Sequence, residues 1–499
     1  MNKLETRTKK AFTLIIARLS NILIALGISA TLSRVIIDKE VYGALQQLLM
    51  IYSMLSVIFA AGIPQSIFYF LPHYNDGERK GLLLQNIGLL FLQGLMLGLI
   101  LFTLRNWASE AFHSPSLSNL FRVFALYPVF MLPTLSVEAV LMSYGHVLTF
   151  MIFSILSRTL TFLSLVMPII FGLSIENSIL IWDGAALILL IISLMLVFVP
   201  VRKAELIWNY GMLKKELKYS LPLAGAAILS SVIVYTDKVI VSKILGAFDY
   251  AIYANGAIEL PLIGIITGSV QSVLMIDFSL KVKQGLHSEI INIWHRAVFK
   301  TALILLPFCG FLFFWAKDFI ILLFSQRYTE SYEIFRIYIW MVPVKIFTFS
   351  SILLPFGASL IFTEIILVNA FIAVAIIPAL AYFFGMNGAA LGTIIVFWLI
   401  FLYGIFRTSP QIKTTFTCFL PWGKISILLI AVIIFGGISK ITISNVHIAK
   451  YISTPEMISA LNLMFGFLIF IILYTIFLEK TKYFQIKTYG KQFFFKTGF

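Results

Sequence analysis

Charged side chains are scarce in this sequence. Asp, Glu, Lys and Arg make up 12% of the 499 residues, whereas 60% are hydrophobic. A soluble globular domain has about 25% charged residues, so this composition excludes that class. Apolar stretches of about 20 residues recur along the chain, and each can cross about 30 Å of hydrocarbon as a helix. They are continuous rather than alternating, which excludes transmembrane β-strands. The sequence therefore predicts an all-α polytopic membrane protein.

Cysteines and the usual catalytic motifs are also nearly missing. The two cysteines, Cys309 and Cys418, provide neither a disulfide framework nor a zinc site. The six histidines show no metal-ligand spacing such as H-E-x-x-H, and there is no glycine-rich phosphate loop of the Walker type. Asn75-Asp76-Gly77 is a turn signal with a single carboxylate. We therefore predict no catalytic residue, no metal and no cofactor, and a protein that is not an enzyme.

Acidic residues are fewer than basic ones, and the excess gives a formal charge of +15. Binding to nucleic acid is one interpretation of such an excess, but the positions of the charges argue against it. Most Lys and Arg residues fall in short loops on one side of the predicted bundle, as the positive-inside rule expects. We therefore expect no nucleic-acid partner. The same rule places both chain termini in the cytoplasm.

Fourteen apolar spans are expected. They lie at about residues 11–33, 41–71, 82–104, 121–143, 146–172, 177–200, 220–245, 250–276, 297–316, 336–357, 359–384, 386–407, 423–440 and 458–478. Each is predicted to be one transmembrane helix, and glycine or proline within a span is tolerated when neighbouring helices satisfy the freed backbone groups.

Four sequence motifs recur in the same order, at offsets of about 204–214 residues, which indicates an internal duplication. The matched pairs are Leu32-Ser33-Arg34 with Val241-Ser242-Lys243, Gln65-Ser66 with Gln271-Ser272, Phe121-Arg122-Val123 with Phe335-Arg336-Ile337, and Phe171-Gly172 then Asp183-Gly184-Ala185-Ala186 with Phe384-Gly385 then Asn387-Gly388-Ala389-Ala390. Each copy has six spans, an even number, so both copies share one orientation in the membrane, as in parallel transporter repeats. The last two helices fall outside the repeat.

The predicted organisation follows from this duplication. It consists of an N-lobe at 1–200, a basic cytoplasmic linker at 201–218, a C-lobe at 219–408, appended helices at 409–479, and a basic, aromatic cytoplasmic tail at 480–499. The tail suits a helix on an anionic inner leaflet, and a disordered basic tail is the alternative.

Ionisable side chains at membrane depth are costly and usually face an interior cavity. At a rise of ~1.5 Å per residue, Arg158 lies ~18 Å along its span, close to the midplane. One interpretation is a basic central cavity that binds an anionic headgroup. Its predicted lining residues are Arg18, Arg34, Arg158, Lys238 and Lys345. Two acidic residues, Glu259 and Asp237, are candidates for binding a coupling ion.

A structural interpretation competes with this one. In it the basic residues pair with acidic ones to fix helix packing, and the available partners are Glu138, Asp183, Glu259 and Glu364. Arg34 and Lys238 can also extend to the outer interface. Asp237 and Lys238 are adjacent in sequence and point about 100° apart on a helix, so they are not expected to pair with each other.

Several segments resemble a known transporter group. They are Ser33-Arg34 to Tyr42-Gly43, Gly62-Ile63-Pro64, Phe70-Leu71-Pro72, Tyr219-Ser220-Leu221-Pro222, and Tyr253 to Pro261. Together with two six-span copies and two extra helices, the chain resembles the multidrug/oligosaccharidyl-lipid/polysaccharide (MOP) exporter superfamily. Within it, the chain is most similar to the polysaccharide (O-antigen or capsule, Wzx-like) flippases. The group has no short invariant signature, and Asp277 stands where analogy suggests a proline.

The resemblance implies a function and a cellular setting. The substrate would be an undecaprenyl-pyrophosphate-linked oligosaccharide, moved across the bacterial inner membrane by alternating access, for surface polysaccharides such as lipopolysaccharide O-antigen. A basic cavity suits this substrate because Arg engages phosphate oxygens bidentately. The expected partners are membrane lipids, a coupling ion (H⁺ or Na⁺), and the polysaccharide polymerase and chain-length machinery. A drug or organic-cation antiporter of the same superfamily and a membrane polysaccharide polymerase or ligase are the alternatives.

Overall fold

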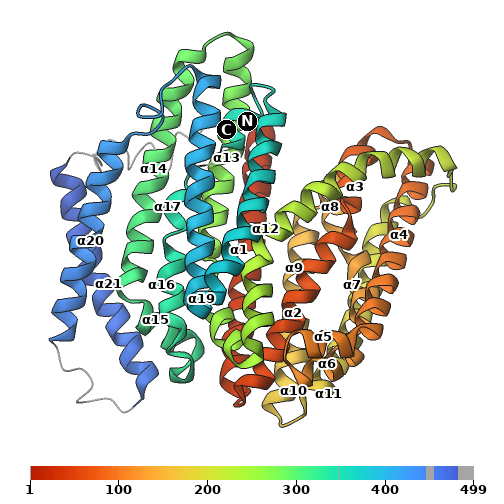
Figure 1. The fold of residues 1–499 in the computed structure, drawn as a ribbon. Coiled ribbons are helices and arrows are strands. Elements are labelled where there is room, and N and C mark those ends of the chain that lie inside the picture. The colour runs from red at the N-terminus through yellow and green to blue at the C-terminus, as the bar shows by residue number, and fades with distance from the viewer. Residues whose placement is uncertain (1, 348, 446–453, 482–499) are drawn as a thin grey trace. The chain divides into compact units, whose positions relative to one another are not determined.

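The computed structural model describes residues 2–347, 349–445 and 454–481, and within these ranges every regular element is a helix (Figure 1). The chain forms two compact units, Met1–Ala251 and Ile252–Phe499. The predicted all-α membrane architecture is confirmed. Most of the predicted cytoplasmic tail, residues 482–499, lies outside the described residues.

Unit 1 holds eleven complete α-helices in the described residues, and a twelfth, α12, begins in it and ends in unit 2. They are α1 (Asn2–Val35), α2 (Lys39–Ala60), α3 (Ile63–Phe70), α4 (Asp76–Thr103), α5 (Arg105–Ala111), α6 (Pro115–Phe124), α7 (Tyr127–Thr134), α8 (Ser136–Ser143), α9 (Val147–Thr161), α10 (Met167–Ile170), α11 (Ile175–Phe198) and α12 (Tyr210–Gly256). A π-helical turn, Phe162–Val166, joins α9 to α10.

The remaining helices of the described chain belong to unit 2. They are α13 (Pro261–Lys283), α14 (His287–Phe314), α15 (Ala316–Phe324), α16 (Ser331–Ile339), α17 (Val342–Lys345), α18 (Ser350–Leu353), α19 (Ser359–Thr408), α20 (Trp422–Ser444) and α21 (Pro455–Lys480). Within this unit α14 packs against α20, and α21 packs against both α15 and α20.

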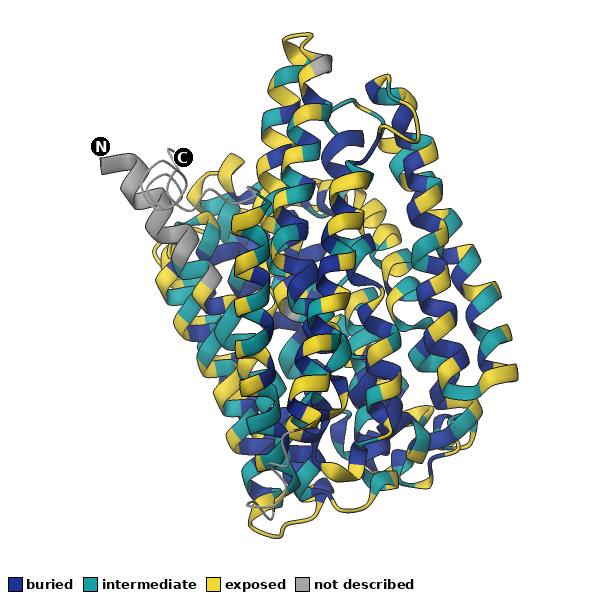
Figure 2. Ribbon diagram, turned by 90° about the vertical axis from the view of Figure 1, so that its left-hand side faces the viewer, coloured by how far each residue is buried: buried dark blue, intermediate teal, exposed yellow. Residues whose placement is uncertain are grey.

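The number of spans agrees with the sequence. In the described residues twelve helical segments are long and apolar enough to cross a membrane, and the bent pair Pro115–Phe124 with Tyr127–Ser143 makes a thirteenth if it is one span. The segment Ser359–Ile412 is 54 residues long, and the non-helical Gly385 divides it into two. This division gives the fourteen spans that were predicted. Exposed residues run along the length of the helices rather than only at their ends (Figure 2), as expected where lipid surrounds the protein.

The repeated motifs adopt similar local structures in the two units. Phe121-Arg122-Val123 lies on the short helix α6, and α7 follows with Pro128 in its first turn. Likewise, Phe335-Arg336-Ile337 lies on the short helix α16, and α17 follows with Pro343 in its first turn. Gly172 and Gly385, which occupy matched positions, both have a positive φ. These resemblances support two copies of one helical pattern.

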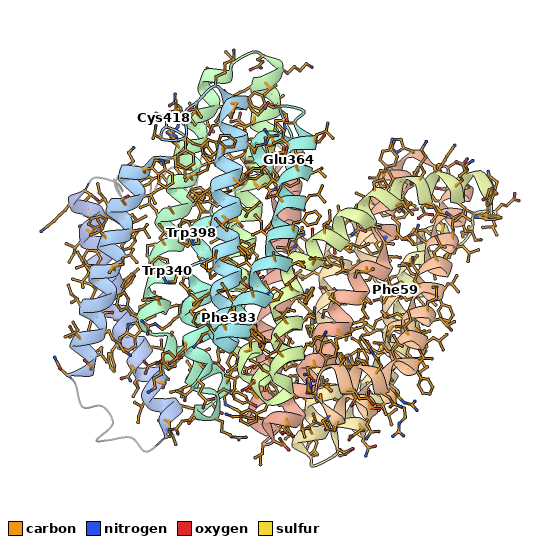
Figure 3. All side chains as sticks on the ribbon, in the orientation of Figure 1. Phe59, Trp340, Glu364, Phe383, Trp398 and Cys418 are labelled. Atoms are coloured by element: carbon orange, nitrogen blue, oxygen red, sulfur yellow. The ribbon has the colours of Figure 1, made fainter. Side chains whose placement is uncertain are left out.

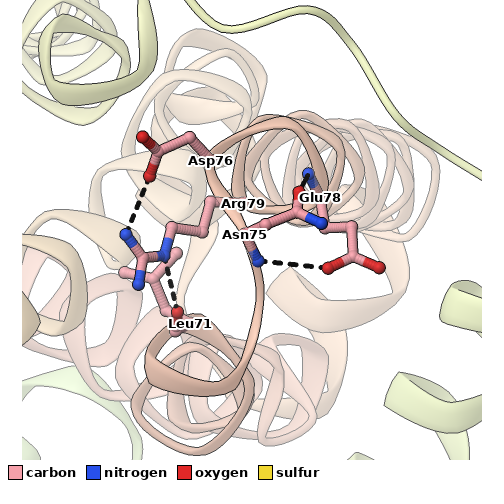
Figure 4. A network of polar contacts seen from close by, with 5 residues as sticks. All are labelled: Leu71, Asn75, Asp76, Glu78 and Arg79. Carbon is pink, nitrogen blue, oxygen red and sulfur yellow. Dashed lines mark hydrogen bonds and ion pairs between the residues drawn. The ribbon is translucent and has the colours of Figure 1, made fainter.

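The turn predicted at Asn75 begins α4. The Asn75 side chain accepts a hydrogen bond from the Glu78 backbone N–H at 3.0 Å, and Glu78 accepts one from the Asn75 N–H at 3.1 Å (Figure 4). Such a capping box satisfies two backbone donors that the first turn of a helix leaves unpaired. Arg79 binds Asp76 at 2.9 Å and donates to the Leu71 carbonyl at 3.0 Å. Asp76 therefore has a structural partner at a helix start.

A buried carboxylate fastens the beginning of α12 to α3 and α4 in unit 1. Glu216 is 1% exposed and accepts a hydrogen bond from the Ser66 hydroxyl at 2.6 Å. The side-chain amides of Gln85 and Asn86 also donate to it. The Gln85 side-chain oxygen in turn accepts from the Trp208 indole N–H at 2.6 Å. We call Glu216, Ser66, Gln85 and Asn86 the Glu216 network.

A second charged cluster attaches the last two helices within unit 2. Asp318 on α15 binds Lys440 of α20 at 2.7 Å and accepts a hydrogen bond from Asn462 of α21 at 3.0 Å. The Lys440 ammonium also lies 4.0 Å from the centre of the Trp315 ring. At Gly466 of α21, an added Cβ would lie 2.3 Å from the same ring. Charge pairing and close packing therefore act together to dock α20 and α21.

We expect Asp318→Ala to loosen this docking. The change leaves the half-buried Lys440 and the Asn462 amide without their acceptor, which should cost about 1–3 kcal/mol. Thermal unfolding of the purified chain in detergent measures the loss. Asp76→Ala is the matched control. Asp76 forms an ion pair with Arg79, but its side chain is 72% exposed, so this pair should contribute about 0–1 kcal/mol. Equal shifts in the two variants would show that Asp318 does not hold the helices.

Candidate functional site

The predicted site residues are divided between the two units, and each group is described by itself. Unit 1 holds Arg18, Arg34, Arg158, Asp237 and Lys238, whereas unit 2 holds Glu259 and Lys345. The structure shows which of them have partners inside their own unit.

In unit 2 the structure brings together Glu259 and Lys345, 86 positions apart in sequence. The Lys345 ammonium donates to a carboxylate oxygen of Glu259 at 2.6 Å. The side chains remain 26% and 47% exposed, respectively, so the pair is accessible. Both residues line a small pocket of about 90 Å³ with Phe335, Tyr338 and Val342. The Lys345 ammonium also lies 5.6 Å from the centre of the Phe397 ring.

Breaks in the helices place these two side chains. Helix α12 ends at Gly256 and α13 begins at Pro261, so Glu259 lies on an irregular segment between them. Gly256 permits a close approach to α16, since an added Cβ would lie 2.6 Å from the Ser331 carbonyl oxygen. Lys345 ends the four-residue helix α17. Irregular backbone at membrane depth occurs where it is buried in protein or lines a cavity, which fits the pocket here.

In unit 1, Arg18 and Arg158 lie on two helices that pack together, α1 and α9. The Asn21 amide on α1 donates to the Ser154 hydroxyl on α9. Arg18 is three residues from Asn21 and Arg158 is four residues from Ser154, so each shares a helix face with one side of that contact. Both Arg side chains are exposed. Within the described residues of unit 1, neither forms an ion pair with an acidic side chain.

Arg158 also lies beside an aromatic cluster. The rings of Tyr52, Phe124, Tyr127 and Trp182 contact one another, with the Tyr127 and Trp182 centroids 4.3 Å apart. Arg158 is close enough to the Tyr52 and Tyr127 hydroxyls to interact with both electrostatically. A π-helical turn follows α9 directly after this position, and such turns are frequent at functional sites.

The other three predicted residues of unit 1 lie in local environments. The Arg34 guanidinium donates to the Ala30 carbonyl on its own helix at 3.0 Å. Lys238 is half-buried, with its ammonium 5.5 Å from the centre of the Tyr235 ring. Asp237 is 1% exposed. The expectation that Asp237 and Lys238 act as separate groups agrees with their different burial.

Two acidic residues of unit 1, Asp183 and Glu138, are further candidates for the functional site. Asp183 is 4% exposed, and neither carboxylate oxygen has a hydrogen-bond partner in the described residues. Glu138 lines a pocket of about 460 Å³ in unit 1 together with Gln65 and Ser56. The sequence predicts both residues only as structural partners of basic side chains. Their position along a predicted span can be read from the sequence, but the lack of a nearby partner among the described residues appears only in the three-dimensional structure.

The structural interpretation therefore holds for some charges and not for others. Glu259 pairs with Lys345, and Glu364 pairs with Arg407 at 2.5 Å while also accepting a hydrogen bond from Tyr403. Arg18 and Arg158 have no acidic partner in the described part of unit 1. Both are exposed, so an anion can reach them.

Comparisons with known proteins add family and fold. Residues 8–275 match the profile of the family described as polysaccharide biosynthesis protein. The solved lipid II flippase MurJ, in an inward closed conformation, superposes with a TM-score of 0.71 and 15% identity, covering 95% of this chain and 99% of MurJ. No curated protein sequence matches this chain significantly.

Two further solved structures share the fold. An inward-facing multidrug resistance MATE family transporter of the MOP superfamily gives a TM-score of 0.61 at 14% identity, covering 80% of this chain and 99% of that chain. A MOP superfamily transporter from Pyrococcus furiosus, described as having a binding pocket of reversed polarity, gives 0.54 at 14% identity, covering 83% and 97%. At such identities the likeness shows the fold alone. The predicted resemblance to the MOP superfamily is confirmed, and these proteins are flippases and transporters rather than enzymes.

Proposed function

Since this chain belongs to the polysaccharide biosynthesis protein family, we propose that it moves a lipid-linked oligosaccharide from the cytoplasmic to the outer leaflet of the bacterial inner membrane. The cargo would be an undecaprenyl-pyrophosphate-linked oligosaccharide, carried by alternating access for surface polysaccharide synthesis. The polysaccharide polymerase and chain-length machinery would act on the product. Both termini would face the cytoplasm, following the positive-inside pattern.

The observation that carries this proposal is the pair of available arginines in unit 1. Arg18 and Arg158 are exposed on neighbouring helices and are not neutralised by an acidic side chain in the described residues of that unit. A pyrophosphate offers several anionic oxygens, and the planar guanidinium engages such oxygens with two parallel hydrogen bonds. At membrane depth an unpaired charge is costly, so a role in binding an anionic cargo explains why these residues are present.

The Glu259–Lys345 pair supports a coupled cycle. A pyrophosphate that binds Lys345 must compete with Glu259 for the same ammonium group. When Lys345 turns to the cargo, the Glu259 carboxylate loses its counter-ion and becomes a site for H⁺ or Na⁺. Asp237, which is buried, is the second candidate for the coupling ion. In this scheme the cargo on Lys345 and the coupling ion on Glu259 are bound at the same time.

A drug or organic-cation antiporter is the second candidate function. One observation favours it: Asp183 and Glu138 present carboxylates in unit 1 without ion-pair partners in the described residues. A cationic cargo would bind these carboxylates, and its transport would not depend on Arg158. The two functions therefore predict opposite consequences for substitutions at Arg158 and at Asp183.

The test follows the glycan across the membrane. In cells depleted of the protein, the lipid-linked glycan is expected to accumulate on the cytoplasmic leaflet, where an outer-face label cannot reach it. Restoring Arg158→Ala should give at least about tenfold less export, the loss of one charge-assisted contact. Arg202→Ala is the matched control, because Arg202 is exposed outside the regular helices. Normal export by Arg158→Ala at normal abundance would contradict the proposal.

A further inference from the structure

Helix α16 has two different faces in unit 2. Phe335, Tyr338 and Val342, the last in α17, line the small pocket that holds the Glu259–Lys345 pair. Glu333, Arg336 and other residues at helical spacing from them lie on the opposite side, as the period of 3.6 residues requires. They line a separate pocket of about 600 Å³. The proposed transport chemistry uses only the first face, so the second needs its own explanation.

The pocket on the second face combines opposite charges with aromatic rings. The Arg336 guanidinium stacks 4.6 Å from the centre of the Phe313 ring and makes no ion pair in the described residues. Glu333, one turn away on α16, accepts a long hydrogen bond of 3.4 Å from Tyr332. The Trp398 indole N–H donates to the Trp340 backbone carbonyl at 3.1 Å, and both residues line this pocket (Figure 3). We call this the α16 polar pocket.

An apolar pocket of about 280 Å³ continues from the α16 polar pocket. The two share Phe313 and Trp340 as a common wall. The apolar pocket is otherwise formed between α14 and α20 by Leu306, Leu429, Val432 and Ile433, among others. Leu306 is seven residues before Phe313 on α14, so the pocket extends about 10 Å along the helix axis. A polar end and an apolar end thus adjoin each other on one side of unit 2.

We propose that these joined pockets bind a zwitterionic phospholipid of the phosphatidylethanolamine type. The Arg336 guanidinium stacks on the Phe313 ring, and its N–H groups donate to the phosphate. Glu333 accepts from the primary ammonium, and the surrounding aromatic faces attract the same cation. One acyl chain fills the apolar pocket between α14 and α20, where the lining is hydrophobic as in other ligand sites.

The charges favour this headgroup over other lipid headgroups. Phosphatidylglycerol carries only a negative charge, so Glu333 would oppose it. Phosphatidylcholine has a cation, but its trimethylammonium group has no N–H to donate to Glu333. The lipid-linked cargo has a pyrophosphate without a cation, and it too would leave Glu333 without a partner. Of the headgroups compared, ethanolamine is the one that satisfies both Arg336 and Glu333.

Such a lipid would brace α20 against α14 and α16. The full chain, reconstituted in phosphatidylcholine vesicles, is therefore expected to unfold at a higher temperature when phosphatidylethanolamine is added. Phosphatidylglycerol at the same fraction should give no comparable rise. Native mass spectrometry of the chain released from the mixed vesicles should retain phosphatidylethanolamine in preference to the other two lipids.

Two variants test the residues. Arg336→Ala should weaken retention of phosphatidylethanolamine about tenfold, the effect of losing one charge-assisted contact. Glu333→Gln should remove the preference for phosphatidylethanolamine over phosphatidylcholine while leaving the fold intact, because the amide has the same shape. The matched control is Arg122→Ala, since Arg122 occupies the corresponding position on α6 in the first sequence copy and is also exposed. It should leave lipid retention unchanged.

Three results would overturn the proposal. The first is equal retention of phosphatidylethanolamine by the wild type and Arg336→Ala. The second is equal stabilisation by phosphatidylglycerol and phosphatidylethanolamine, which would reduce the effect to general anion binding. The third is a polyprenyl-linked glycan that competes with phosphatidylethanolamine for retention and is itself lost in Arg336→Ala, which would assign the pockets to the cargo. Glycan export is not the readout, so failure here leaves the proposed function standing.

Discussion

Replacing Lys345 with Ala is expected to lower glycan export by about 10- to 100-fold. The proposed contact between its ammonium and a phosphate oxygen is a charge-assisted hydrogen bond, which contributes about 1.5–3 kcal/mol. Since every 1.4 kcal/mol is about tenfold in an equilibrium constant, the loss should be large. Export of labelled lipid-linked glycan, measured together with the abundance of the protein in the membrane, tests it.

The Glu259–Lys345 pair requires a second variant to separate binding from packing. Lys345→Ala alone removes the ion pair with Glu259, so a purely structural role would also give a loss. The double variant Lys345→Ala with Glu259→Gln removes the orphaned charge. If Lys345 only neutralises Glu259, the double variant recovers export. If export stays low although the fold and abundance recover, the pair acts in transport, through Lys345 and the cargo or through Glu259 and the coupling ion. The single variant Glu259→Gln, which keeps Lys345, separates these two roles.

Replacing Glu216 with Ala is expected to destabilise unit 1 by about 1–3 kcal/mol, the cost of leaving buried hydrogen-bond donors without their acceptor. Ser66 and Asn86 are both fully buried, so their donors would lose a charged acceptor where water cannot replace it. Thermal unfolding in detergent, followed by tryptophan fluorescence, measures the loss.

Two control variants show whether a loss of stability in Glu216→Ala is specific to the buried Glu216 network. Glu216→Gln keeps the shape and one acceptor oxygen, so it should cost less than the Ala change. Glu289→Ala removes a carboxylate that pairs with Lys281 while being 52% exposed, and such pairs contribute about 0–1 kcal/mol. If Glu216→Ala were as mild as Glu289→Ala, the Glu216 network would not anchor α12.

The membrane spans could be predicted because their signal is local. Continuous apolar runs define the helices, and short polar or glycine-containing segments define their ends. The gap predicted between residues 245 and 250 contains Gly246, which has φ 81° and interrupts the long helix α12. Gly385 separates two predicted spans in the same way. Glycine tolerates the positive φ that such helix breaks require. A glycine between two apolar runs therefore marks the break in the sequence.

Charge partners could not be predicted because they depend on distant contacts. Glu216 stands among Lys214, Lys215 and Lys218 in the segment predicted as a cytoplasmic linker, and nothing in that stretch indicates burial. Residues more than 120 positions away, on α3 and α4, supply its donors. Depth estimates make Lys345 and Glu259 candidate site residues, and the sequence offers Glu259 as one of four possible acidic partners without assigning it to Lys345. Helical periodicity indicates on which face of a helix a residue lies, but it does not indicate which residue of another helix it contacts.

Under the proposed lipid binding, the two faces of α16 would link membrane composition to transport. Headgroups bound to Arg336 and Glu333 would restrict the rotation of this nine-residue helix. The same helix carries Tyr338 and is followed by Lys345, which pairs with Glu259. By thermodynamic linkage, whatever changes the lipid affinity on one face changes the ion-pair equilibrium on the other. A cell that alters its phospholipids would thereby retune the exporter without changing its amount.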